Sequence, residues 1–130
     1  MLFRSIKNLK KNGVRILSPI SYKELSKISY CYYATVLPYR IDIDLMSSVT
    51  ISNRGFKLLS LGLPLIYSDL QNLINAQRDV IWKCKTKEDF LEAAKTLKNA
   101  RPGPMINAFL SDHLEMNRKN QLTQILESII

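Results

Sequence analysis

Two cations three residues apart, Arg54 and Lys57, form the pattern best able to do chemistry in this chain of 130 residues. They would share one face of a helix that begins at Ser52 or Asn53, because residues three apart are neighbours on a helix surface. Cations at a helix N-terminus oppose the helix dipole and cost about 0.3 to 1 kcal/mol each. The spacing therefore predicts an anion site at this helix start. The alternative is a pair of exposed side chains that tolerate the penalty.

The loop before this helix carries one further cation and two carboxylates. Arg40 follows Pro38 at the end of an apolar run, where it could face the same anion or form a surface ion pair. Asp42 and Asp44 can accept hydrogen bonds from the hydroxyls of a ribose or another sugar. Carboxylates in loops are also commonly solvated, so both interpretations stay open for this pair.

The sequence identifies no catalytic residue and no metal ligands. His113 is the only histidine, and no Ser, Cys or Asp partner occurs at a recognisable spacing, so we expect a structural histidine. Cys31 and Cys84 stand singly without a C-x-x-C pattern. This favours reduced, partly buried thiols over a disulfide or a zinc site, and no cofactor is expected.

The elements that must position these residues alternate between strand and helix signals at short intervals, which is typical of an α/β protein. Short apolar runs predict four strands, at residues 14–17, 33–37, 64–67 and 79–82. Because these runs lack polar alternation, we expect a parallel sheet that is covered on both faces. Three aromatic residues are expected in the core and at its rim: Tyr30, Tyr32 and Tyr33.

Helices are predicted from capping patterns and from apolar periodicity. Ser21 with Glu24, and Thr86 with Asp89, have the spacing of capping boxes. A further helix over residues 53–61 should end at Gly62. After a break at residues 101–104 the chain is predicted to be helical to its end. Four apolar residues are spaced there as a core-facing stripe: Leu122, Ile125, Leu126 and Ile129.

Ligands of parallel sheets bind beyond the carboxyl ends of the strands, often with a phosphate at a helix N-terminus. The loops 38–51 and 67–71 follow two of the predicted strands. We therefore expect both loops and the helix start near residue 53 on one rim of the sheet.

Five segments, in the same order and spacing, resemble bacterial sugar-nucleotide glycosyltransferases. Residues 51–66, I-S-N-R-G-F-K-L-L-S-L-G-L-P-L-I, are similar to the family pattern S-P-x-K-x-x-E-Y-L-A-x-G-K-P-V-V. Residues 34–41 are similar to A-D-V-x-L-L-P-F-R-I, and residues 21–25 to V-S-Y-E-E-L. Residues 79–98 and 109–126 look like the strand and helix segments that follow in the family.

The resemblance implies the later part of the donor-binding domain of a GT-B glycosyltransferase of the surface-polysaccharide or capsule type. The whole chain, residues 1–130, would be one partial, Rossmann-like domain. It would be an incomplete three-layer sandwich with about four parallel strands flanked by helices, and with a long C-terminal helix. The substrate would be a nucleotide-diphosphate sugar, and the sugar would go to a cell-surface glycan.

The resemblance also assigns roles to site residues. Arg54 stands where the family pattern has a phosphate-neutralising lysine. Lys57 replaces the glutamate that receives the ribose hydroxyls, and an ammonium group has donors only. The residues expected at the donor phosphate are Arg54, Ser52, Asn53 and Arg40. Those expected at the ribose or sugar are Lys57, Asp42 and Asp44.

The family's acceptor domain and the first strands of its donor domain have no counterpart here, so we expect no activity from this chain alone. The missing strands would leave unpaired backbone groups in the sheet. The predicted strand at residues 14–17 could pair with the strand at 33–37, or a second copy or the missing glycosyltransferase half could fill the gap. A non-catalytic interaction or regulatory module on the same scaffold is the alternative function.

The net charge of +8 comes mostly from the N-terminus, where five cations and no acid occur in the first fifteen residues. These cations are Arg4, Lys7, Lys10, Lys11 and Arg15. Phe3, Ile6 and Leu9 recur between them, so residues 1–12 are a candidate basic amphipathic helix. Such a helix could contact an anionic membrane or a polyanion; a packed helix with one solvated face is the alternative.

Charge alone motivates a third function, nucleic-acid binding, which the lack of a helix-turn-helix, zinc-finger, RNP or KH pattern disfavours. No apolar run approaches the roughly 18 residues of a membrane span. We therefore expect a cytoplasmic protein, with peripheral contact at the inner face of the membrane as an option.

Overall fold

The computed structural model describes residues 2–42, 46, 50, 51, 53–113 and 115–129. The protein is α/β, with a parallel sheet in the strand order β1-β2-β3. The strands are β1 (Thr35–Leu37), β2 (Leu65–Ser68) and β3 (Ile81–Cys84). Val36 pairs with Ile66, and Ile66 pairs with Trp82. The α/β class and the parallel sheet that the sequence predicts are therefore confirmed.

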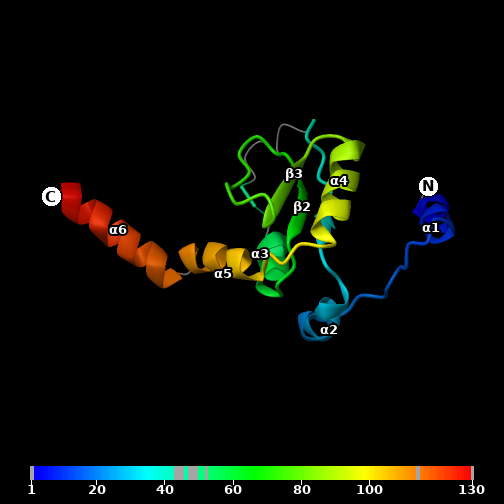
Figure 1. The fold of residues 1–130 in the computed structure, drawn as a ribbon, viewed down its shortest axis with the longest axis horizontal. Coiled ribbons are helices and arrows are strands. Elements are labelled where there is room, and N and C mark those ends of the chain that lie inside the picture. The colour runs from blue at the N-terminus through cyan, green and yellow to red at the C-terminus, as the bar shows by residue number, and fades with distance from the viewer. Residues whose placement is uncertain (1, 43–45, 47–49, 52, 114, 130) are drawn as a thin grey trace.

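Six α-helices and one short 3₁₀ helix surround or extend from this sheet in the described residues (Figure 1). They are α1 (Leu2–Lys11), α2 (Tyr22–Ile28), η1 (Ser29–Cys31), α3 (Asn53–Ser60), α4 (Lys87–Leu97), α5 (Gly103–Asp112) and α6 (Glu115–Ile129). None of the described helices is long and apolar enough to cross a membrane.

Both predicted capping boxes are present. The Ser21 hydroxyl accepts from the Glu24 amide at 3.2 Å, and the Glu24 carboxylate accepts from the Ser21 amide at 3.0 Å. At α4, Thr86 and Asp89 exchange the same two bonds at 3.2 and 3.0 Å. Backbone hydrogen bonds from Lys85 and then Thr86 hold the pKa of Asp89 below its ordinary value.

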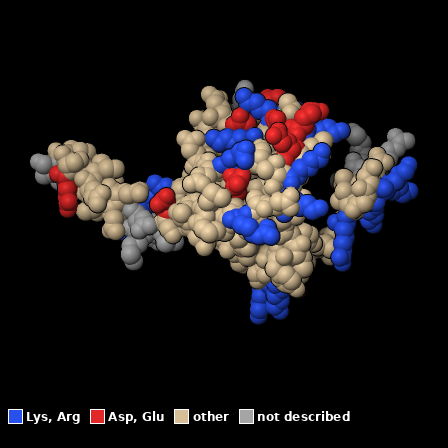
Figure 2. All heavy atoms as spheres, viewed as in Figure 1, with Lys and Arg blue, Asp and Glu red and all other residues tan. Residues whose placement is uncertain are grey.

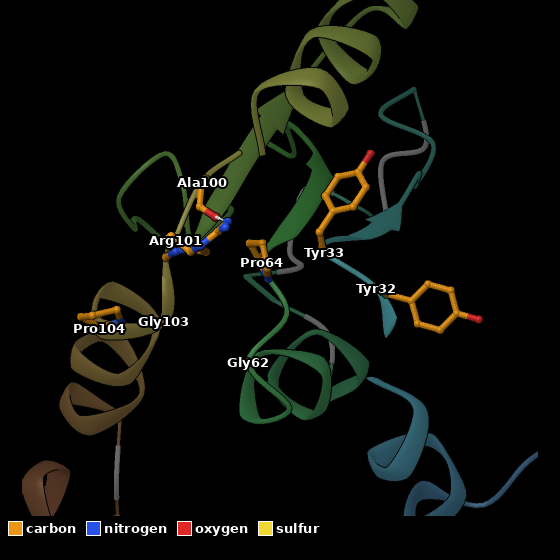
Figure 3. A pocket seen from close by; sticks show the side chains of 9 residues that line it. Tyr32, Tyr33, Gly62, Pro64, Ala100, Arg101, Gly103 and Pro104 are labelled. Carbon is orange, nitrogen blue, oxygen red and sulfur yellow. Dashed lines mark hydrogen bonds between the residues drawn. The ribbon is translucent and has the colours of Figure 1, made fainter. Parts of the chain in front are cut away.

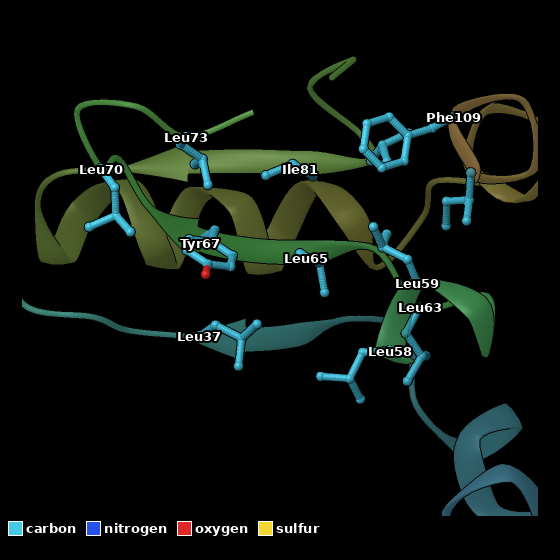
Figure 4. Packing of buried hydrophobic residues seen from close by; sticks show 12 residues of the cluster. Leu37, Leu58, Leu59, Leu63, Leu65, Tyr67, Leu70, Leu73, Ile81 and Phe109 are labelled. Carbon is cyan, nitrogen blue, oxygen red and sulfur yellow. The ribbon is translucent and has the colours of Figure 1, made fainter. Parts of the chain in front are cut away.

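Helices pack on both faces of the sheet. On one face α3 and α5 cover the strands, and Figure 4 shows Leu58, Leu59 and Phe109 directed at Leu65 and Ile81. On the other face α4 covers the sheet. The buried residues of this second cluster are Ile66, Trp82, Cys84, Ala93 and Leu97. The short strands are apolar because they are buried on both sides.

Gly55 lets the first turn of α3 approach the sheet closely. A Cβ atom at this position would lie 3.0 Å from Cγ1 of Ile51 and 3.2 Å from Cδ1 of Leu65. At the other end of the helix Gly62 has a φ of 81°, which is the left-handed conformation that ends helices. The predicted extent of α3 and its stop are therefore confirmed.

The predicted strand at residues 14–17 is wrong. Residues 14–20 have no regular secondary structure, and Val14, Ile16 and Leu17 are exposed. A strand is stable only when a neighbour satisfies its backbone groups, and no described strand pairs with this segment. Among the described residues the sheet consequently has three strands instead of about four, and β1 lies at its edge.

The C-terminal helix is confirmed, but its predicted core-facing stripe is wrong. The helical region divides at His113, and α6 extends away from the sheet (Figure 1). Leu122 is 57% exposed and Ile129 is 74% exposed. Apolar periodicity predicts the helix correctly, but it does not supply a partner for the apolar side.

Two further expectations need correction. Tyr30, on η1, is 85% exposed, and Tyr32 and Tyr33 are also exposed, so these tyrosines are not core residues. The strand that is predicted at residues 79–82 is β3, and it begins at Ile81, two residues later than predicted. The amides of Val80 and Ile81 both donate to the Gln77 carbonyl, so a turn holds the start of the predicted segment.

Candidate functional site

The two loops that follow β1 and β2 meet at the rim formed by the carboxyl ends of the strands, whereas the first turn of α3 packs on Leu65, the first residue of β2. The expectation that the helix start lies on this rim is therefore wrong. β1 ends at Leu37, the loop 38–52 follows, and α3 then leads back to the start of β2. The loop after β2 meets this first loop. The Ser68 hydroxyl donates to the Tyr39 carbonyl at 2.6 Å, and the Ile74 amide donates to the Thr50 carbonyl at 2.8 Å. The predicted meeting of the two loops on one rim is therefore confirmed.

The helix α3 presents two cations to solvent, Arg54 in its first turn and Lys57 in its last turn. The expectation that both lie at the helix start is therefore wrong for Lys57. Asn53 is also exposed, whereas Gly55 and Leu58 are buried against the sheet. The first turn contains no acidic residue. Within the described part of the chain, neither Arg54 nor Lys57 has a carboxylate within 4 Å. Ser52, which the sequence also assigns to the anion site, lies outside the described residues.

Arg40 and Asp42 are joined to each other. Nε of Arg40 donates to Oδ1 of Asp42 at 3.1 Å, and Nη2 donates to Oδ2 at 2.6 Å. The pair is exposed. These hydrogen bonds lower the pKa of Asp42 and raise the pKa of Arg40. The surface ion pair, one of the two alternatives for Arg40, is thus formed. Asp44 lies outside the described residues.

The rim also contains an ion pair that sequence reasoning missed. Nζ of Lys85, just after β3, lies 3.7 Å from Oδ2 of Asp69, just after β2. The Asp69 amide donates to the Cys84 carbonyl at 2.9 Å, which fixes the loop against the neighbouring strand. The sequence could have indicated that Asp69 and Lys85 lie on one rim, because both residues immediately follow the carboxyl end of a strand.

The two cysteines are free and have different surroundings. Cys31 is exposed, which corrects the expectation of partial burial for this thiol. Cys84 is fully buried on β3, and burial raises the pKa of its thiol to about 11. The negative charges of Asp89, Asp69 and Glu92 add to this rise. A thiol with a raised pKa is a poor nucleophile at neutral pH, so Cys84 is a packing residue.

His113 ends α5 and has a structural role. Its Nδ1 donates to the Phe109 carbonyl at 2.7 Å, and its ring centroid lies 4.3 Å from that of Phe109 and 5.9 Å from that of Phe56. Over the described residues, no group of three His, Cys, Asp or Glu side chains could hold a metal ion.

A pocket of about 330 Å³ lies at the opposite rim, where the strands begin (Figure 3). Tyr33 precedes β1, Pro64 precedes β2, residues 100–102 lead from α4 to α5, and Gly103 and Pro104 begin α5. Arg101 bends back so that Nη1 donates to the Ala100 carbonyl at 3.0 Å. Sequence reasoning missed this pocket because its walls come from three distant segments. Gly62, beyond the C-terminus of α3, lines it, so α3 separates it from Arg54.

Comparison of the chain with protein-family models, with curated proteins and with solved structures finds no match.

Proposed function

We propose that this chain is the later part of the donor-binding domain of a glycosyltransferase, with a partial Rossmann-like fold. The start of α3 would bind the diphosphate of a nucleotide-sugar. The observation that carries the proposal is the pair of exposed cations on α3, with Arg54 in the first turn and Lys57 three residues later. Backbone amides at a helix N-terminus and nearby cations together form an anion site.

Phosphate recognition has more support than ribose recognition. Arg54 offers a planar fork of donors, which suits two phosphate oxygens, and Lys57 adds a second positive charge one turn along the helix. Lys57 cannot accept the hydrogen bonds of ribose hydroxyls. Asp42 can, but its carboxylate already accepts two hydrogen bonds from Arg40. A ribose would have to share Asp42 with that arginine.

The proposal assigns only donor binding to this chain. Transfer of the sugar to a surface-polysaccharide acceptor would need a catalytic base and an acceptor site. We assign both to a separate glycosyltransferase half or to a second copy of the chain. Binding of the nucleotide can be tested without that partner.

Thermal unfolding of the purified chain with UDP, GDP and their sugars tests this proposal. A ligand that binds only the folded state stabilises it, by about 2.7 kcal/mol at one hundred times its dissociation constant. We expect at least one nucleotide to raise the melting temperature and Arg54→Ala to abolish the rise. Arg101→Ala, in the pocket beyond the C-terminal end of α3, is the matched control and should keep it. No shift at millimolar nucleotide, or an equal shift in Arg54→Ala, would contradict the proposal.

A second candidate, an interaction module, is favoured by the open edge of β1. The Thr35 amide donates to the Pro64 carbonyl, so the backbone groups of the next residue, Val36, point to the free edge. The Val36 side chain is 51% exposed. No strand among the described residues covers this edge. A second copy or another protein could add a strand there.

Sedimentation velocity over a range of concentrations tests the self-associating form of this candidate. If copies pair through β1, the wild-type chain should form dimers, and Val36→Pro should be monomeric because proline has no amide donor at the free edge. Dimers that persist in Val36→Pro, or a wild-type chain that is monomeric throughout, would exclude self-association through β1.

A further inference from the structure

The helix α1 is separate from the body of the molecule. It lies away from the sheet in Figure 1, and none of its described side chains belongs to either buried cluster. Leu9 is 46% exposed, and Ile6 is only partly buried. A helix whose apolar side chains do not pack against its own protein needs another apolar environment for them.

The described residues of α1 divide into an apolar and a basic side. Ile6 and Leu9 are three apart and share one side, whereas Lys7 and Lys11 are four apart and share another. Lys7, Lys10 and Lys11 are all exposed. Figure 2 shows both signs of charge on the visible face of the body, but no acidic residue on α1. The first acid in the sequence is Glu24.

We propose that α1 lies in the surface of an anionic lipid bilayer, with Ile6 and Leu9 in the acyl boundary and its lysines at the head groups. A nucleic acid would satisfy the cations but would leave the apolar side in water, so the amphipathic division favours lipid. An isolated helix of this length is marginally stable in water, so we expect binding to increase its helicity. This inference is independent of the proposed donor site.

The segment after α1 allows this placement. Gly13 has a φ of 82° and ends the helix, and its amide donates to the Lys10 carbonyl at 3.1 Å. Residues 14–21 then lead to α2 without regular secondary structure. Such a segment can span up to about 25 Å, which is enough to keep the sheet clear of the head groups while α1 lies flat.

Co-sedimentation of the whole chain with phosphatidylcholine vesicles, with and without 30 mol% phosphatidylserine, tests the proposal. We expect binding only to the anionic vesicles. The triple variant Lys7→Gln, Lys10→Gln, Lys11→Gln should lower the partition coefficient about 100-fold, since each lysine near the surface contributes a factor of about five. The matched control Lys87→Gln, Lys95→Gln, Lys98→Gln removes the same charge from α4 and its C-terminus and should lower it less than about threefold.

A second variant distinguishes binding to a lipid surface from binding to a polyanion. Leu9→Ser keeps every charge, and we expect it to weaken vesicle binding about tenfold. It should leave the melting temperature unchanged, because α1 lies outside the core. Failure of the wild-type chain to sediment with anionic vesicles would overturn the proposal. So would equal losses in both triple variants, or unchanged vesicle binding in Leu9→Ser. Binding to a single-stranded RNA without vesicle binding would assign α1 to nucleic acid instead.

Discussion

At the residue scale, Arg54 places ligand binding and folding in opposition. Arg54 lies at the positive end of the α3 dipole, and the first turn contains no acidic residue to offset it. A protein commonly carries such a local penalty where a ligand relieves it. The same substitution should therefore affect the free protein and the complex in opposite directions.

Arg54→Ala should stabilise the ligand-free protein, by about 0.3 to 1 kcal/mol, because it removes an unfavourable charge from the helix start. Urea unfolding of the two proteins at low ionic strength measures this difference. The gain should shrink at high salt, since exposed charges are screened. A destabilised variant would mean that Arg54 has a structural role in α3.

Cys84 predicts a pH dependence of stability at high pH. The pKa of its buried thiol is raised from 9.0 to about 11, so between these values the folded state keeps a proton that the unfolded state loses. The stabilising contribution is complete below pH 9 and is lost as the pH rises through 11. The free energy of unfolding should therefore decrease between pH 8 and pH 10.5, and the decrease should be larger in the wild type than in Cys84→Ala. Equal falls would contradict the raised pKa.

At the element scale, local patterns predicted the helices well. The capping boxes at Ser21 and Thr86 involve residues only three apart, so the sequence contains all the groups that form them. Gly62 is a similar case, because one residue supplies the left-handed conformation that ends α3. The position of α3, which carries Arg54, was predictable for the same reason.

Patterns that depend on distant partners were less informative. The apolar run at residues 14–17 has the composition of a strand, but no described strand pairs with it. The stripe on α6 has the right period, but its side chains are exposed. The sequence places Asp69 and Lys85 after neighbouring strands, but their ion pair depends on loop geometry, which single-sequence patterns do not specify. The Arg40–Asp42 pair joins residues two apart and is one of the two alternatives that the sequence offered for Arg40.

Gly55→Val tests the close packing of α3 on β2. A Cβ atom alone would already lie 3.0 Å from Cγ1 of Ile51 and 3.2 Å from Cδ1 of Leu65, and valine adds two methyl groups. We therefore expect the free energy of unfolding to fall by about 1 to 3 kcal/mol. Gly103→Ala is the control, because a Cβ there has no neighbour within 4 Å, and it should be neutral or slightly stabilising. Similar effects of both substitutions would argue against this packing.

At the scale of the whole molecule, a small, well-buried body carries exposed extensions at both ends. The two clusters on the faces of the sheet contain the buried hydrophobic core, whereas α1 and α6 contribute no described residue to it. Exposed apolar side chains on α1, β1 and α6 give the molecule several surfaces on which a membrane or a partner could bind.

Leu59→Ala and Leu122→Ala compare the body with the C-terminal extension. Leu59 is fully buried between α3 and the sheet, so its truncation should cost about 2 to 5 kcal/mol. Leu122 is exposed on α6, and its truncation should change stability by less than about 0.5 kcal/mol. Denaturant unfolding measures both. A large loss in Leu122→Ala would show that α6 is buried in solution by folding back or by association.

The most direct test of the donor-site proposal is NMR chemical-shift mapping of the backbone amides during titration with UDP. We predict that the largest changes occur at Asn53, Arg54 and Gly55 in the first turn of α3, and that Arg54→Ala removes them. The amides of Ala100 and Gly103, in the pocket beyond the C-terminal end of α3, should move little. Changes centred on that pocket, or no changes at millimolar UDP and GDP, would contradict nucleotide binding at α3.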